Sequence, residues 1–253
     1  MVFLEKREFR DIANNPKFVS EYWVPVDKLS LSALQIFASR YINPQDREVS
    51  RLLLKVGTGI GKTLTSLESV RVFGQMFHHL YMKSEEARHV IVLGYAKQVF
   101  MRELMKYPEL GIITYDELYK SHQFEQRILN STGVNRERFK LELAGFRQKI
   151  KKRITSEVLG GMYLFYGYKQ LVNQLFDDGI PEGANQSNIF QLYKEKKLRV
   201  NKMLLAKFRN GCIIADEIHQ VYNSKEINNY GLAIQFVLDY HAENVTFIAL
   251  SAT

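Results

Sequence analysis

A glycine-rich run between Val56 and Thr63 is the first part of this sequence whose residue types suggest chemistry. It lies between an apolar stretch and a stretch of helical pattern, and it ends in Lys62 and Thr63. Glycines at a helix N-terminus let backbone N–H groups approach a phosphate chain, where the helix dipole adds positive potential. Lys62 would reach the β- and γ-phosphates as a point charge, and Thr63 would offer its hydroxyl to Mg²⁺. The run therefore predicts a nucleotide site formed by Gly57, Thr58, Gly59, Ile60, Gly61, Lys62 and Thr63.

This run departs from the strict phosphate-loop pattern at its first position, where Val56 stands in place of glycine. The alternative interpretation is an ordinary glycine turn that precedes a lysine. Because a strand pattern comes before the run and a helix pattern after it, we favour the phosphate site.

Two adjacent carboxylates, Asp216 and Glu217, directly follow the apolar residues 212–215. Hydrolysis of ATP needs a carboxylate that holds the Mg²⁺ shell and a group that positions the attacking water. We assign Asp216 to Mg²⁺, together with Thr63 and partly through water, and Glu217 to the water. An acidic pair is more often a solvated turn, but the apolar strand before it and the phosphate loop upstream favour catalysis. The predicted catalytic residues are Lys62, Asp216 and Glu217.

A histidine and two hydroxyl residues form a third candidate group. His219 lies two residues after the acidic pair, and Ser251 and Thr253 follow the apolar run 247–250. Hydroxyl residues at a strand end can hydrogen-bond a neighbouring histidine or carboxylate. A lone histidine is more often structural. This group is therefore a candidate functional group only because it follows the other two motifs in the sequence.

Composition and charge restrict the class of protein. The chain has 253 residues, of which 46% are apolar and 12% aromatic, so it can bury a sizeable core. Its formal net charge of +8 favours a polyanionic partner. The single cysteine, Cys212, cannot form an intrachain disulfide, which indicates a reducing compartment. The charged start is unlike a signal peptide, and no apolar stretch approaches the ~20 residues that span a bilayer. We therefore expect a soluble intracellular protein without membrane contact.

Apolar strand patterns alternate with helical patterns, which indicates an α/β fold with a mostly parallel central sheet flanked by helices. Residues 117–160 break this rhythm and are interpreted as a helical insertion, because Lys, Arg, Glu and Gln dominate there. We expect strands near 52–56, 90–94, 112–115, 162–166, 212–215 and 245–250, and helices near 30–41, 62–80, 97–105, 169–176, 189–208 and 230–240. Residues 1–50 would form an N-terminal helical segment and residues 51–253 the nucleotide-binding domain.

The three motifs, in this order, resemble motifs I, II and III of superfamily 2 DExH-box helicases and translocases. They read Thr-Gly-Ile-Gly-Lys-Thr at 58–63, Asp-Glu-Ile-His at 216–219 and Ser-Ala-Thr at 251–253. The helicase form of motif I is looser at the position of Val56. The resemblance implies a RecA-like phosphate-loop domain that binds ATP and Mg²⁺ and couples hydrolysis to movement along nucleic acid.

The same resemblance implies roles for further residues. His219, Ser251 and Thr253 would link hydrolysis to movement, and Gly94–Lys97 would take the place of motif Ia. Gln35 would read adenine, with a glutamine on a helix surface as the alternative.

A finer resemblance connects the chain to helicase-type transcription proteins of large cytoplasmic DNA viruses. This group includes the poxvirus early transcription factor small subunit and nucleoside triphosphate phosphohydrolase I. The resemblance is carried by the stretches 52–63, 165–169 and 215–223. It implies an ATPase of viral transcription whose partner is a viral RNA polymerase or another transcription factor subunit. Its location would be the viral factory in the host cytoplasm, and also the virion.

In this superfamily a second RecA-like domain supplies an arginine finger, which is worth about 10³–10⁵ in rate. The sequence stops at Thr253, directly after motif III. We therefore expect that second domain, a partner within the full-length protein, to be absent from this chain. The chain alone would bind nucleotide and turn it over weakly.

Lysines and arginines cluster at 147–153 and at 194–209 and could neutralise phosphates, with solvated helix faces as an equal alternative. No base-reading module is recognisable, so contacts would be with the backbone, and with DNA in preference to RNA. Three alternatives stay open: a replication helicase, a chromatin-type or restriction-type DNA translocase, and a non-catalytic phosphate-loop scaffold.

Overall fold

The computed structural model describes residues 31–41, 50–57, 59, 61–81, 89–94, 97–155, 162–222, 228–241 and 245–252. Thr58, Ile60 and Thr253, together with most of the expected N-terminal segment 1–50, lie outside these described residues. The described residues divide into two compact units. One comprises residues 32–97 and 163–253, and the other is formed chiefly by residues 98–162.

A five-stranded sheet is the centre of the first unit, and all its strand pairs are parallel. The strands are β1 (Arg51–Lys55), β2 (Val90–Leu93), β3 (Tyr163–Tyr166), β4 (Cys212–Ala215) and β5 (Thr246–Ser251). Their order across the sheet is β1-β5-β4-β2-β3. Every residue of β2, β4 and β5 is buried, as expected for central strands of a parallel sheet covered on both faces. The expected α/β fold with a parallel sheet is confirmed.

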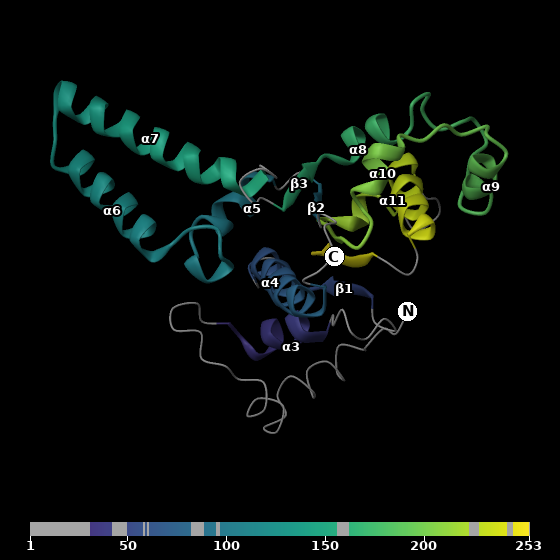
Figure 1. Cartoon of the computed structure of the whole chain (residues 1–253), viewed down its shortest axis with the longest axis horizontal. Helices are drawn as coiled ribbons and strands as arrows, with labels where there is room; N and C mark the ends of the chain where they lie inside the picture. Colours follow the sequence, from purple (N-terminus) through teal and green to yellow (C-terminus); the bar gives the residue numbers. More distant parts are fainter. Residues whose placement is uncertain are drawn as a thin grey trace. The chain divides into compact units, whose positions relative to one another are not determined.

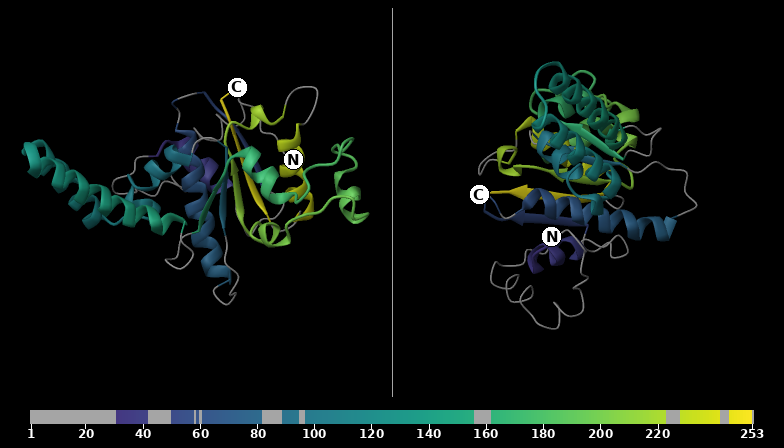
Figure 2. Two further views of the ribbon diagram at one scale, coloured as in Figure 1. Left: turned by 90° about the horizontal axis from the view of Figure 1, so that it is seen from above. Right: turned by 90° about the vertical axis from the view of Figure 1, so that its left-hand side faces the viewer.

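Helices cover both faces of this sheet (Figure 2). On one face lies α4 (Lys62–Tyr81), which contacts α3 (Ala33–Tyr41). On the other face, alternate residues of β2, β4 and β5 form one core with α8 (Tyr168–Leu175), α10 (Lys202–Ala206) and α11 (Asn229–Tyr240). The α11 side chain Phe236 is fully buried and meets Phe176 edge-on, with ring centroids 5.6 Å apart. This packing holds the strands in register and thereby fixes where each strand ends.

The second unit is helical and contains most of α5 (Lys97–Leu104), then the short η2 (Pro108–Leu110), α6 (Tyr115–Leu129) and α7 (Gly133–Thr155). Figure 1 shows α6 and α7 as a hairpin. The pairing is antiparallel, because Glu117 contacts Arg153 at 2.8 Å while Phe124 packs on Phe146 at 6.0 Å between centroids. The described part of the expected insertion 117–160 is thus helical apart from the turn at 130–132, and residues 156–160 lie outside the described residues. The domain boundaries themselves stay a prediction.

Two local predictions were wrong, and in both cases side-chain capping explains the difference. Residues 112–115 form no strand, because Thr114 caps α6 instead. The Glu117 N–H donates to Thr114 Oγ1 at 3.2 Å, and the Thr114 N–H donates to Glu117 Oε2 at 3.0 Å. This reciprocal capping box satisfies two backbone donors at the helix start.

The helix expected over 189–208 is two short helices, α9 (Ile189–Lys194) and α10. Between them Lys196 adopts φ +59°, and Val200 forms an antiparallel bridge with Phe176. The Asn201 side chain then caps α10 by accepting from the Leu204 N–H at 3.0 Å. A left-handed residue followed by an Asn cap ends one helix and starts another.

Among the described residues, no helix combines the length and apolar character needed to cross a bilayer.

Thr114→Ala removes the α6 cap and should lower the free energy of unfolding by about 1 kcal/mol. Hydrogen exchange at the first-turn amides of α6, read together with a denaturant melt, checks this. Thr155→Ala, at the exposed last residue of α7, is the matched control and should leave both measurements unchanged. Equal exchange in the two variants would show that the capping box contributes nothing.

Candidate nucleotide site

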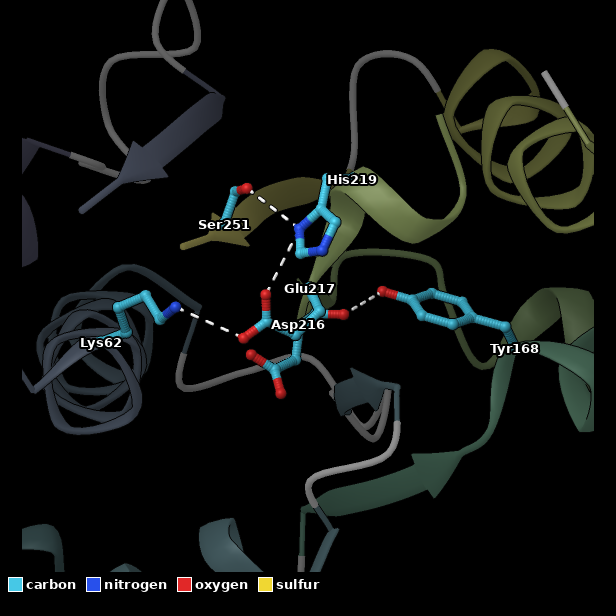
Figure 3. A network of polar contacts seen from close by, with 6 residues as sticks. All are labelled: Lys62, Tyr168, Asp216, Glu217, His219 and Ser251. Carbon is cyan, nitrogen blue, oxygen red and sulfur yellow. Dashed lines mark hydrogen bonds and ion pairs between the residues drawn. The ribbon is translucent and has the colours of Figure 1, made fainter. Parts of the chain in front are cut away.

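The candidate site lies at the carboxyl edge of the sheet, where β1, β4 and β5 end (Figure 3). Strand β5 separates β1 from β4 and pairs with both, with Lys55 opposite Ser251 and Ala215 opposite Ala249. Because parallel strands end at the same edge, the residues after β1 and β4 are brought together although they are far apart in sequence.

The glycine loop after β1 has the backbone that the sequence predicts. Gly59 and Gly61 have φ values of +81° and +77°, which only glycine adopts readily. Lys62 is the first residue of α4, so the loop leads directly into a helix N-terminus. Upstream, the Val56 N–H donates to the Ser251 carbonyl at 3.1 Å and ties the start of the loop to β5.

Lys62 reaches across this edge to the acidic pair. Its Nζ lies 3.4 Å from Glu217 Oε1, and its side chain is 12% exposed. Glu217 adopts φ +52° and ψ +48°, a left-handed conformation that is costly for a residue with a Cβ and that turns its carboxylate toward the lysine. The other oxygen, Oε2, is buried and has no hydrogen-bond partner among the described residues. Its polar neighbour there is His219 Nδ1, 3.3 Å away, and a bound water or ligand would have to share or replace that contact.

Asp216 directly follows β4 and precedes Glu217. Burial raises the pKa of its carboxyl above the ordinary value, and the neighbouring Glu217 charge raises it further, while Lys62 acts in the opposite sense. Thr63 lies in the first turn of α4 next to Lys62. The described residues hold no cluster of three or more His, Cys, Asp or Glu side chains that could bind a metal alone. A cation here would depend on Asp216, Thr63 and oxygens from a bound ligand or water.

His219 and Ser251 also meet at this edge, as the sequence predicts for a hydroxyl at a strand end. His219, in η4 (Ile218–Gln220), places Nδ1 3.2 Å from Ser251 Oγ and 3.3 Å from Glu217 Oε2. The imidazole therefore touches both the acidic pair and the end of β5.

Gln35 is buried and lies against the glycine loop. A Cβ added to Gly61 would come within 2.5 Å of Gln35 Nε2. Its Oε1 accepts from the Ser32 N–H at 2.8 Å, and its own N–H donates to Ser32 Oγ at 3.3 Å, which caps α3. The structure thus gives Gln35 a capping contact and a loop contact, and its role in reading adenine stays a prediction.

Two residues at the site were not predicted to contact it. Gly94 has φ +127°, and an added Cβ would lie 3.1 Å from the Asp216 carbonyl oxygen and 3.2 Å from Asp216 Cβ. The hydroxyl of Tyr168 donates to the same carbonyl. A glycine directly after a buried strand is a sequence signal for such close approach. Nothing in the local sequence distinguishes Tyr168 from other core tyrosines.

The basic cluster at 147–153 is partly neutralised within the second unit. Arg147 contacts Glu125, and Arg153 contacts Glu117. Lys149, Lys151 and Lys152 are exposed. In the cluster at 194–209, Lys197 pairs with Glu195 at 2.8 Å and Arg199 pairs with Asp178 at 2.5 Å.

Comparison with known proteins gives one group of relatives. The chain is 32% identical over 237 residues to proteins named early transcription factor large subunit homolog from African swine fever virus. Two of these come from the isolates Tick/Malawi/Lil 20-1/1983 and Tick/South Africa/Pretoriuskop Pr4/1996. The similarity covers 83% of this chain but 21% and 20% of those relatives, so the chain spans about a fifth of their length. Their name specifies a large subunit, whereas the resemblance drawn from short stretches pointed to a small subunit. No family model matches the chain.

Gly94→Ala should lower the free energy of unfolding by about 1–3 kcal/mol, because alanine is strained at this φ and its Cβ presses on Asp216. Gly145→Ala is the matched control, since Gly145 lies within α7 with open space around its Cα. That change should stabilise by about 0.5–1 kcal/mol. Denaturant melts measure whether the free energy of unfolding falls for Gly94→Ala and rises for Gly145→Ala. A Gly94→Ala variant as stable as wild type would show that Asp216 does not crowd the added Cβ.

Asp216→Asn should stabilise the unliganded protein at pH 7. The folded state holds this carboxyl with a raised pKa and so binds its proton more tightly than the unfolded chain, which means that its stability contribution falls as pH rises. The gain of the Asn variant should therefore shrink on acidification and vanish below about pH 4, where Asp is protonated even in the unfolded chain. Melts at pH 7 and at acidic pH, with the exposed Asp177→Asn as control, measure this. A less stable Asp216→Asn at pH 7 would contradict the assigned desolvation.

Proposed function

We propose that this chain is the ATP-binding part of a superfamily 2 nucleic-acid-dependent ATPase that serves viral transcription. The observation that carries the proposal is the 3.4 Å approach of Lys62 Nζ to Glu217 Oε1, across 155 positions of sequence. It joins a lysine after the glycine loop that follows β1 to a carboxylate after β4, two strands away across the sheet. The similarity to early transcription factor homologs of African swine fever virus supports the viral transcription role.

The residues divide the work of hydrolysis among them. Backbone N–H groups of the glycine loop and the Lys62 ammonium would bind the β- and γ-phosphates of ATP. Asp216 and Thr63 would hold Mg²⁺, which when bound neutralises charge on the phosphates. Lys62 would exchange its contact with Glu217 for a phosphate oxygen, and this would free the Glu217 carboxylate to orient the attacking water.

His219 gives this site a connection to the end of β5. Its Nδ1 lies within 3.3 Å of Glu217 and within 3.2 Å of Ser251. A movement of the Glu217 carboxylate on hydrolysis would therefore alter the contact of His219 with Ser251. We propose that His219, Ser251 and Thr253 transmit hydrolysis to nucleic-acid movement.

The proposed polymer partner is DNA in preference to RNA, bound through its phosphate backbone. The exposed Lys149, Lys151 and Lys152 provide positive charge for such contacts, because the acids of α6 pair with other residues of that cluster. The full-length protein would add a second RecA-like domain with an arginine finger, and a viral RNA polymerase or another transcription factor subunit would be its protein partner. Its place of action would be the viral factory and the virion.

A replication helicase or DNA translocase would use the same site, whereas a phosphate-loop scaffold would bind ATP without hydrolysing it. Steady-state ATPase and nucleotide-binding measurements on the full-length protein, with and without DNA, separate the motor from the scaffold. Lys62→Ala should abolish most nucleotide binding, since it removes the phosphate-binding charge. Glu217→Gln should retain binding and lower kcat by about 10²–10⁴, because the water loses its positioning carboxylate.

Exposed residues supply the controls for charge removal. Lys140→Ala on α7, outside both basic clusters, and Glu182→Gln in the loop before α9 should keep wild-type binding and kcat. Wild-type turnover by Glu217→Gln would overturn the assigned role. Binding without turnover in the wild-type protein, in the presence of DNA, would favour the scaffold.

A further inference from the structure

The main chain just after β4 is held by a tyrosine on α8, the helix that follows β3. Tyr168 is the first residue of α8 and follows β3 through Gly167. Its hydroxyl donates a hydrogen bond to the main-chain carbonyl of Asp216, 48 positions away in sequence (Figure 3). The contact lies directly beside the peptide bond that joins Asp216 to Glu217.

Asp216 is thereby constrained through its backbone on several sides. Its N–H donates to the Leu93 carbonyl at 2.9 Å, which extends the β2–β4 pairing by one residue. Gly94 packs closely against its carbonyl oxygen and its Cβ, which an added Cβ would approach to 3.1 Å and 3.2 Å. Tyr168 binds the carbonyl itself. These contacts use main-chain groups and Cβ and leave the Asp216 carboxylate available for a ligand.

The Tyr168 bond bears directly on the conformation of Glu217. The Asp216 carbonyl belongs to the peptide plane whose rotation sets the φ angle of Glu217. That angle is +52°, in a region unfavourable for a residue with a side chain. If the plane rotated to relieve the strain, the Glu217 carboxylate would swing away from Lys62. A donor fixed on the carbonyl opposes this rotation.

The position of the Tyr168 ring is itself set by packing. The residue is 1% exposed, belongs to the core formed with α11, and stacks on Tyr230 at 6.4 Å between ring centroids. A phenylalanine would fill the same space, so packing alone does not call for the hydroxyl. A rigid ring in a close-packed core can hold its hydroxyl at a defined point.

We propose that Tyr168 is a positioning residue for ATP hydrolysis, which holds the Asp216–Glu217 peptide so that Glu217 keeps its left-handed conformation. The inference rests on the proposed ATPase function. Tyr168 acts through Asp216 and Glu217, because its hydroxyl is bonded to the Asp216 carbonyl. The phosphate-binding groups, Lys62 and the glycine loop, are on the other side of β5 and do not depend on its hydroxyl.

The test is Tyr168→Phe in the full-length protein, with Tyr163→Phe as matched control. Tyr163 is also buried in β3, but it starts that strand and lies at the end of the sheet away from the site. For Tyr168→Phe we expect kcat to fall by about tenfold, the equivalent of one buried hydrogen bond. The KM for ATP should stay within about twofold, since phosphate binding is intact. The Mg²⁺ concentration for half-maximal rate should rise, because Asp216 is less well held.

The control separates positioning from general stability. Tyr163→Phe should keep the wild-type kcat and the wild-type Mg²⁺ dependence, whatever its melting midpoint. An active wild type with an unchanged kcat in Tyr168→Phe would overturn this inference alone. Equal losses in both variants, matched by equal losses of folded protein, would also overturn it. A wild-type protein without ATPase activity would instead remove the proposed function, and this inference with it.

Discussion

The approach of Lys62 to Glu217 depends on a constraint of parallel sheets, namely that all strands end at one edge. With β5 between β1 and β4, the glycine loop and the acidic pair are two strands apart. A lysine side chain on the first turn of α4 can bridge that distance, and here it does so at 3.4 Å. A strand order with more strands between β1 and β4 would leave the same residues at the same edge but out of each other's reach.

The carboxyl of Asp216 lies where ionisation is energetically unfavourable. Burial and the adjacent Glu217 both disfavour an ionised Asp216, as its raised pKa shows. Glu217 adds backbone strain and a buried oxygen without a hydrogen bond among the described residues. Strain and unmet polar groups persist at functional sites when the surrounding structure holds them in place. Here the holding groups are Leu93, Gly94 and Tyr168, which fix the main chain of Asp216 without engaging its carboxylate.

The hairpin of α6 and α7 shows why a count of charges overstates a basic surface. Arg147 and Arg153 belong to a dense basic run, yet they pair with Glu125 and Glu117 of the facing helix. Arginine forms such pairs readily because its planar group matches a carboxylate. The charge that is left for an external polyanion is concentrated on the lysines of α7.

Local patterns in the sequence predicted the five strands of the sheet, together with one at 112–115 that does not form, and they located the glycine loop and the acidic pair. Short apolar runs bounded by turn residues and alternating with helical patterns are typical of buried parallel strands, and glycines before a lysine at a helix start are typical of a phosphate loop. The caps at Thr114 and Asn201 are also local features of the sequence. The apolar patterns around them instead favoured a strand at 112–115 and a single helix over 189–208. Strand order, the left-handed Glu217 and the bond from Tyr168 to Asp216 were decided only by tertiary structure. The physical reason is that strand order and the Tyr168 bond bring together segments that are distant in the chain. These contacts, and the Glu217 conformation that accompanies them, form only when the core packs.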